Sequence, residues 1–180
     1  AERPGLLLER SALDLAGVAR AAAESFKPRF ADAAIALRVE ARSVWVDGNA
    51  SRLEQVVSNL LSNALHYTEA GGSVVLRVES TGGDAVIEVA DTGVGIAPSE
   101  LPRLFERFHR VQGTRARTHE GTGIGLALVQ ELVKLHGGSI SVESEPDRGT
   151  TFAVTLPAGT HHLPPGHLIG MSTSAAAHPT

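Results

Sequence analysis

The chain of 180 residues contains no cysteine, which excludes both a disulfide framework and a thiolate metal site. Aromatic residues make up only 4% of the sequence, and no apolar run approaches the length of a membrane-spanning helix. Basic residues are not in excess, because the formal net charge is −4, and this argues against a broad surface for nucleic acid. Apolar residues still reach 42%, enough for a buried core. The composition therefore predicts one globular domain.

An initiator methionine and a secretory signal are also missing at the start, Ala1-Glu2-Arg3-Pro4. We interpret the chain as a piece of a longer protein. Residues 1–11 are expected to be a linker and residues 12–157 the folded domain. Beyond Leu156 the pattern dissolves into Pro, Gly, His, Ser and Ala, so residues 158–180 are expected to be a disordered tail.

Two helices and a strand region are predicted in the first part of the chain. Asp14 is a candidate N-cap for the first helix, which Pro28 should kink or end. The alternation from Ala34 to Val46 predicts one or two strands. Ser51-Arg52-Leu53-Glu54 fits a capping box at the start of the second helix. The apolar stripe of that helix comprises Leu53, Val56, Val57, Leu60, Leu61, Ala64 and Leu65.

Two hairpins and a third long helix are predicted further on. Their expected positions are strands 73–79 and 85–90, a short helix near 98–105, a mobile loop at 112–120, a helix at 126–136 ended by Gly137-Gly138, and strands 139–144 and 150–156. Hairpins require antiparallel neighbours. The predicted fold is therefore an α/β (α+β) two-layer sandwich, with a mixed sheet of about five strands and helices on one face.

Carboxamides on the second helix form the first candidate motif. Gln55, Asn59 and Asn63 are spaced four apart, so they share one face of the helix. A carboxamide oxygen is a neutral hard ligand that suits Mg²⁺ and leaves room for waters and phosphate oxygens. A solvated helix face is the alternative interpretation of the same spacing.

Asp91-Thr92-Gly93-Val94-Gly95 is the second motif, and it follows a short apolar run. A carboxylate at the end of a strand can accept a hydrogen bond from the amino group of adenine, whereas guanine has a carbonyl at that edge. Gly93 and Gly95 remove side chains where the backbone must turn and approach the base. An ordinary strand-to-loop turn would show the same residue types.

Glycines at 121, 123 and 125 form the third motif, directly before a helical pattern. The amides at the N-terminus of a helix can hold phosphates, and glycines let the preceding loop move. Taken alone, this spacing is a weak signal. The three motifs together predict a nucleotide site.

In this order the motifs resemble the ATP-binding catalytic domain of the sensor histidine kinases, within the gyrase/Hsp90/histidine-kinase/MutL ATPase superfamily. Phe105-Glu106-Arg107-Phe108 matches the family's phenylalanine box, and Gly121 to Leu126 matches its GTGLGL segment almost residue for residue. The resemblance covers residues 12–156. It implies a Bergerat-type ATP-binding fold, so that residues 12–157 form an ATP-binding catalytic domain, with ATP and Mg²⁺ as cofactors.

Carried over by residue, the resemblance makes Asn59 the metal ligand and Arg110 a phosphate-facing arginine, both with a catalytic role. Thr150 would support the aspartate site, and Arg115 and Arg117 are expected to be solvated. The nucleotide-binding residues that the resemblance implies are Asn59, Asn63, His66, Tyr67, Asp91, Gly93, Gly95, Ile96, Arg110, Gly121, Thr122, Gly123, Ile124, Gly125, Leu126 and Thr150.

Two positions depart from superfamily patterns. His66 stands where the family usually has a phosphate-contacting lysine, and it makes either a weaker phosphate contact or a helix-end contact with the last carbonyls. Gln55 stands where ATP-hydrolysing members carry a glutamate, and an amide cannot take a proton from water. Glu54 is adjacent but points about 100° away around the helix, and the capping box gives it another role.

The resemblance implies phosphoryl transfer to a histidine on a separate dimerisation hairpin, with a response regulator downstream. None of the eight histidines has the acceptor's His-Glu-Leu/Arg-Thr-Pro setting. We expect a cytoplasmic, monomeric domain that binds no nucleic acid, cut from a homodimeric parent that could be anchored in the inner or plasma membrane. The alternatives are a superfamily ATPase, an anti-sigma-type serine kinase, and a nucleotide-binding module without catalysis.

Overall fold

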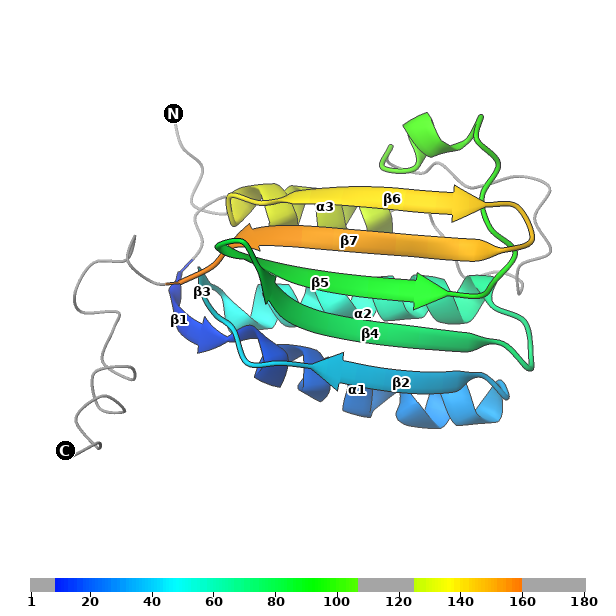
Figure 1. Ribbon diagram of the computed structural model, residues 1–180, viewed down its shortest axis with the longest axis horizontal. Coiled ribbons are helices and arrows are strands. Elements are labelled where there is room, and N and C mark those ends of the chain that lie inside the picture. Colours follow the sequence, from blue (N-terminus) through cyan, green and yellow to red (C-terminus); the bar gives the residue numbers. More distant parts are fainter. Residues whose placement is uncertain (1–8, 107–124, 160–180) are drawn as a thin grey trace.

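The computed structural model describes residues 9–106 and 125–159. Figure 1 shows the elements along the chain. In order they are β1 (Ser11–Asp14), α1 (Leu15–Asp32), β2 (Ala36–Ala41), β3 (Trp45–Gly48), α2 (Ala50–Tyr67), β4 (Ser73–Thr81), β5 (Asp84–Asp91), the 3₁₀ helix η2 (Leu101–Arg103), α3 (Gly125–Leu135), β6 (Ser139–Glu145) and β7 (Gly149–Pro157).

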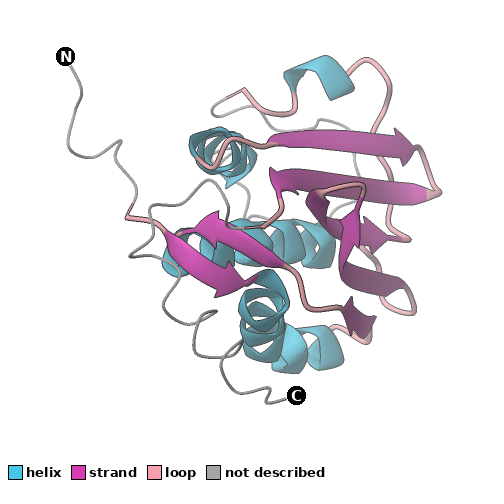
Figure 2. Cartoon of the chain, turned by 60° about the vertical axis from the view of Figure 1, so that its left-hand side comes forward, coloured by secondary structure: helices cyan, strands magenta, loops and turns pink. Residues whose placement is uncertain are grey.

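Five strands form the main sheet in the order β2-β4-β5-β7-β6 (Figure 1). The β2–β4 pair is parallel, and the other three pairs are antiparallel. The helices α1, α2 and α3 all lie on one face of this sheet, as Figures 1 and 2 show from two directions. The predicted two-layer sandwich with a mixed sheet is confirmed.

The helix α2 packs its predicted apolar stripe into the core between the layers. Residues Leu53 to Leu61 of the stripe are completely buried, Ala64 is 2% exposed, and Leu65 is half-buried. Burying one Leu or Val side chain stabilises a fold by about 1.5–3 kcal/mol. The stripe therefore fixes which face of α2 points away from the core.

Among the described residues, no helix has both the length and the apolar character needed to cross a membrane.

The predicted capping box at the start of α2 is wrong. Asn49 is the N-cap, because its backbone is extended and its side-chain oxygen accepts a hydrogen bond from the Arg52 amide at 3.0 Å. Ser51 already lies in the first helical turn, and Glu54 is too far along the helix to complete a capping box. The capping role expected for Glu54 is therefore absent.

Other boundaries also differ from the sequence prediction. α1 has the predicted N-cap, Asp14, but it does not end at Pro28 and continues to Asp32. Pro28 is exposed, so water can reach the carbonyl that its missing N–H leaves unpaired, while Phe26 and Phe30 on either side are buried. The short helix expected at 98–105 is only the single turn of η2.

The segment expected to be a linker ends in a short strand that the sequence does not predict. β1 pairs antiparallel with β3, and the pairing includes Ser11 with Gly48. At the other end, Ala158 and Gly159 donate backbone hydrogen bonds to Gly83 and Trp45. The loop expected at 112–120 and residues 160–180 of the expected tail lie outside the described residues.

The turns predicted from glycine pairs are present. Gly82 and Gly83 both have positive φ, 55° and 87°, and join β4 to β5 in a two-residue hairpin. α3 ends where expected, because the Gly137 amide donates to Lys134 and the Gly138 amide donates to Val133. This pair of bonds is a Schellman motif.

A buried histidine joins the end of α3 to the start of α2. His136 Nδ1 donates to the Leu132 carbonyl at 2.8 Å, and Nε2 accepts from the Asn49 amide at 3.1 Å. Burial lowers the pKa of His136, so the ring is neutral, which this pair of bonds requires. Residues before β1 reach the same junction, since the Asn49 side chain donates to the Glu9 carbonyl and Arg10 pairs with Asp47.

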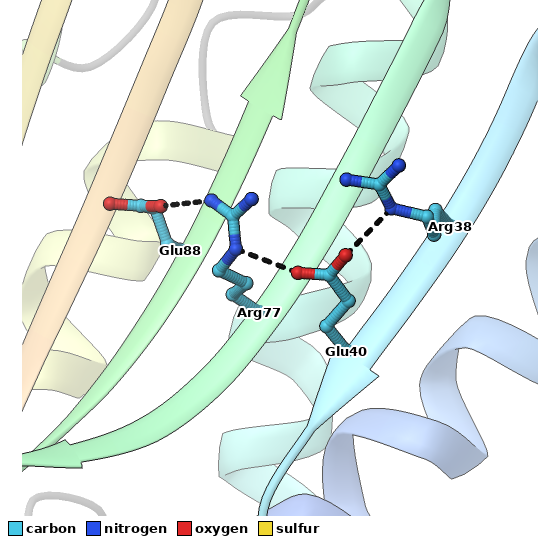
Figure 3. Close-up of polar contacts among 4 residues, drawn as sticks. All are labelled: Arg38, Glu40, Arg77 and Glu88. Atoms are coloured by element: carbon cyan, nitrogen blue, oxygen red, sulfur yellow. Dashed lines mark hydrogen bonds and ion pairs between the residues drawn. The ribbon is translucent and has the colours of Figure 1, made fainter.

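The face of the sheet opposite the helices carries charged side chains. Arg38, Glu40, Arg77 and Glu88 form a row of ion pairs across β2, β4 and β5, with N–O distances of 2.7, 2.9 and 3.1 Å (Figure 3). Hydrogen bonding to Arg77 lowers the pKa of Glu40. Exposed pairs of this kind contribute little to stability. The row shows that this face meets water, so the apolar core lies between the sheet and the helices.

The N-cap assignment is testable on α2. Asn49→Ala should lower the free energy of unfolding by about 1 kcal/mol, because the Arg52 amide loses its acceptor. Ser51→Ala is the matched control and should change it by less than about half of that. Denaturant unfolding of both variants measures the difference, and an equal loss in the two would restore the capping box.

Candidate functional site

Asp91 is the last residue of β5 and faces the helices. The alternation of β5 buries Ala85, Ile87 and Val89 on that side, and Asp91 continues the row with 8% exposure. A carboxylate thus occupies a position where the strand pattern would place an apolar side chain. Such a group requires hydrogen-bond donors to remain buried.

Two backbone amides hold one oxygen of this carboxylate. Asp91 Oδ1 accepts from Gly93 N at 2.8 Å and from Thr150 N at 3.1 Å. No hydrogen bond from the described residues reaches Oδ2. Burial raises the pKa of Asp91, and the bonds from Gly93 and Thr150 offset this only in part. The site therefore presents a second carboxylate oxygen to which no described residue donates a hydrogen bond.

The turn after Asp91 lies in close contact with two other segments. A Cβ on Gly93 would be 2.2 Å from the Tyr67 carbonyl oxygen at the end of α2. Gly95 has a φ of 74°, and its Cβ would be 2.0 Å from the Glu145 carbonyl oxygen at the end of β6. Both glycines are therefore required by the backbone, as the sequence predicts.

The helix α2, which carries the first motif, is bonded to the same turn at its C-terminal end. Gln55, Asn59 and Asn63 are all half-buried, on the flank of the apolar stripe. The Val94 amide donates to the Tyr67 carbonyl at 3.0 Å, which ties the C-terminal end of α2 to the turn. The structure thus connects the helix of the first motif to the second motif.

His66 and Tyr67 form the last turn of α2. Both are half-buried, and their rings meet edge to face with centroids 4.7 Å apart. The backbone carbonyl of Tyr67 lies beside the Asp91 turn, because it accepts from the Val94 amide, and a role of Tyr67 in lining a nucleotide stays a prediction. The alternative roles of His66, at a phosphate or at the helix end, both remain predictions.

Thr150 lies next to Asp91 across the β5–β7 ladder and is 5% exposed. Its hydroxyl is 2.8 Å from the hydroxyl of Ser144, which the sequence analysis missed. Ser144 also accepts from the amide of Ile96 at 2.8 Å, so the predicted residue Ile96 joins this cluster through its backbone. The available signal was a polar residue at the inner position of β6 that continues the row of Ile140 and Val142.

The predicted glycine-rich motif and phenylalanine box lie only in part within the described residues. Gly125 is the exposed first residue of α3, and Leu126 after it is half-buried. Phe105, from the predicted phenylalanine box, packs edge to face against Phe152 at 6.4 Å. The predicted residues that lie outside the described residues are Arg107, Phe108, Arg110, Arg115, Arg117, Gly121, Thr122, Gly123 and Ile124.

A depression of about 320 Å³ lies beside the residues that follow Asp91. It is lined by Glu69, Ala70, Gly72, Thr92, Gly93, Val94 and Asp147. Only Gly93 is shared with the predicted nucleotide site. The depression therefore does not coincide with the space between Asp91 and α2.

The described residues contain no group of three or more His, Asp or Glu side chains that could hold a metal ion. Mg²⁺ bound with a nucleotide needs only one or two protein oxygens, because phosphates and waters supply the others. A half-buried carboxamide such as that of Asn59 suits this coordination.

Comparison with known proteins identifies close similarities. The family described as "Histidine kinase-, DNA gyrase B-, and HSP90-like ATPase" matches residues 48–160. The sensor histidine kinase CusS of Escherichia coli K12 is 40% identical over 158 residues, which cover 88% of this chain and 33% of CusS. The chain therefore spans about a third of the length of this relative.

Two solved structures are similar in fold and sequence. The mycobacterial sensor histidine kinase MprB matches with a TM-score of 0.74 and 32% identity, over 82% of this chain and 97% of that one. Full-length ShkA in complex with AMPPNP also has a TM-score of 0.74 and 32% identity, over 85% of this chain and 32% of ShkA.

The substitution Asp91→Asn should lower the affinity for ATP without lowering the stability of the fold. In Asp91→Asn, an amide group takes the place of the free acceptor oxygen, so the affinity for ATP should fall about ten- to a hundred-fold. The variant should be at least as stable as the wild type at neutral pH, because burial raises the pKa of Asp91 and the charge therefore disfavours folding.

The pH dependence provides a second measurement. The wild type should gain stability as the pH falls from neutral through the raised pKa of Asp91 towards the ordinary value, and this gain should be missing in Asp91→Asn. Thermal melts at several pH values and titration with a fluorescent ATP analogue measure both effects. Unchanged affinity in the variant would remove Asp91 from the site.

Proposed function

Because this chain belongs to the histidine kinase-, DNA gyrase B- and HSP90-like ATPase family, we propose that it is the catalytic domain of a sensor histidine kinase. It binds Mg²⁺ and ATP and transfers the γ-phosphoryl group to a histidine on a separate dimerisation hairpin. The observation that carries the proposal is the buried carboxylate of Asp91, held by two amides through one oxygen and open at the other.

Asp91 supports binding of adenine in particular. The free Oδ2 is an acceptor in a site with little exposure, so it requires a donor such as the 6-amino group of adenine. A 6-oxo purine would place a second acceptor against it. Tyr67 and Asn63 are proposed to line the nucleotide from α2, which the Val94–Tyr67 bond holds beside Asp91.

Asn59 is proposed to hold Mg²⁺ through its side-chain oxygen, together with phosphate oxygens. The ion would supply charge neutralisation at the phosphates when it is bound. Asn59 lies on α2 one turn before Asn63, towards the N-terminal end of the helix and away from the Asp91 turn. This spacing separates the metal and phosphate end of the site from the base end. Arg110 is the predicted cation for the phosphates.

Gln55 favours transfer to a protein over hydrolysis. Its side chain accepts a hydrogen bond from Arg52 at 3.3 Å, and an amide cannot act as a base toward water. In the proposed reaction the bond between the γ-phosphorus and the bridging oxygen breaks, a bond to the acceptor imidazole forms, and ADP leaves. The chain contributes position and charge to this exchange, and the acceptor provides the nucleophile.

The partners follow from the proposed reaction. They are the histidine-bearing dimerisation domain of a homodimeric parent and, downstream, a response regulator. The proposal includes a monomeric state for this chain, a cytoplasmic location, a membrane-anchored parent and no binding of nucleic acid, in keeping with the net charge of −4.

Asn59→Ala tests the metal site. The variant should lose most of the magnesium-dependent rise in melting temperature that ATP produces, and it should fold normally, because Asn59 lies outside the buried stripe. Ser62→Ala, an exposed change on the same helix, is the control and should behave like the wild type. A full magnesium-dependent rise in Asn59→Ala would show that Asn59 is not the ligand.

Phosphoryl transfer is tested by adding a cognate hairpin domain. With labelled ATP, the chain alone should remain unlabelled and release phosphate slowly, whereas an added hairpin should acquire acid-labile label at a rate that rises with its concentration. Acid-stable label on a partner protein would indicate a serine kinase. Rapid phosphate release without a partner would indicate an ATPase.

A further inference from the structure

Ser144 lies behind Asp91 and Thr150, at the end of β6. The inner positions of β6 are Ile140, Val142 and Ser144, so the row that packs toward the core ends in a hydroxyl. Ser144 pairs with Thr150 in the β6–β7 ladder, and Thr150 pairs with Asp91 in the β5–β7 ladder. The three side chains therefore lie in one line across three neighbouring strands.

The hydroxyl of Ser144 makes three hydrogen bonds. It accepts from the Ile96 amide at 2.8 Å and donates to the Gly149 carbonyl at 2.9 Å. The third partner is the Thr150 hydroxyl at 2.8 Å, where the distance alone does not assign the donor. A hydroxyl has one proton and two lone pairs, so these three bonds use its whole capacity.

Counting protons assigns the donor in the third bond. The Gly149 carbonyl can only accept, and the Ile96 amide can only donate. If Ser144 donates to Gly149, its remaining lone pair accepts from Thr150 and all three contacts are satisfied. If Ser144 donated to Thr150, two acceptors would face each other at the 2.9 Å contact with Gly149. Thr150 therefore donates its proton to Ser144.

This assignment sets what Thr150 offers to a ligand. With its one proton directed at Ser144, Thr150 Oγ1 has only lone pairs left for other partners. Thr150 is beside Asp91, whose free Oδ2 is also an acceptor. The base end of the site therefore presents two acceptors and no side-chain donor from these two residues.

Two acceptors suit adenine and not a 6-oxo purine. Adenine offers a 6-amino donor to Asp91, and a water between N1 and Thr150 can donate one proton to each. The 6-oxygen of hypoxanthine or guanine requires a donor, which a free Thr150 hydroxyl could supply directly or through a water. Ser144 removes that possibility by taking the proton.

We propose that Ser144 is a positioning and specificity-determining residue for the base. Through its bonds to Ile96 and Gly149 it fixes the Thr150 hydroxyl as an acceptor, and the site thereby rejects 6-oxo purines. The inference rests on the proposed function, since it concerns the nucleotide that binds beside Asp91.

The test compares ATP with inosine triphosphate, which differs from ATP only at the N1–C6 edge of the base. In Ser144→Ala, the affinity for ATP should fall about three- to tenfold, the size of one lost hydrogen bond, while the affinity for inosine triphosphate should be kept or increased. The ratio of the two affinities should thus fall about tenfold. If Ser144 acted on folding alone, Ser144→Ala would lower the affinities for both nucleotides equally and leave their ratio unchanged.

Three further variants complete the design. Ser141→Ala changes the same residue type on the exposed side of β6 and should keep the wild-type ratio. Ser144→Thr retains a hydroxyl at this position, so it should also have the wild-type ratio of affinities. Thr150→Val removes the hydroxyl in question and should lower the ratio about as much as Ser144→Ala does, and the double variant should lower it no further.

The outcomes separate this inference from the proposed function. A wild-type ratio in Ser144→Ala overturns the inference, and so does a wild-type ratio in Thr150→Val, which remains informative if Ser144→Ala does not fold. If the wild-type chain binds neither nucleotide, the proposed function itself is wrong.

Discussion

The buried carboxylate of Asp91 is the constraint on which this end of the sheet depends. Its charge is disfavoured by burial, so donors must come from segments fixed in place. One donor, Gly93, follows directly in the chain, and the other, Thr150, comes from a neighbouring strand. Gly93 and Gly95 lie in tight contact with the ends of α2 and β6, and these contacts hold the turn where both amides reach one oxygen. The group whose charge burial disfavours is thus the group that we propose binds adenine.

The position of α2 follows from the sheet. β2 and β4 are parallel neighbours, and the chain between them includes β3 and α2, so the helix is the crossover that connects two adjacent strands. Its stripe packs on the sheet, and its end is bonded to the turn after β5. The contacts that build the core therefore also fix the position of α2 relative to the turn after Asp91. The geometry of the proposed binding site and the stability of the fold thus depend on one set of interactions.

The sequence predicts what periodicity and local chemistry determine. The stripe of α2 and the turn after Asp91 are of this kind, because each depends on residues close in the chain. The start of α2 was misplaced because Asn49 and Ser51 are both good capping residues, and only the backbone conformation decides between them. Pro28 is a local signal for the end of a helix, but α1 continues past it because Phe26 and Phe30 on either side are packed in the core. The strand pattern places Ser144 in the inner row of β6 but does not show its partners, because its hydrogen bonds go to Ile96, Gly149 and Thr150 outside that strand.

The pairing of β5 with β7 has a consequence for the order in which the chain folds. Two of the four neighbouring pairs in this sheet, β4–β5 and β6–β7, are joined by short turns, but Asp91 and Thr150 are 59 positions apart. Closing a loop of that length costs conformational entropy that a local hairpin does not. A chain that has formed only the β4–β5 and β6–β7 hairpins therefore has both halves of the carboxylate site and no completed site. Under the proposed function, competence to bind the base is acquired at the step that joins the two hairpins, so ligand binding would report on a non-local event of folding.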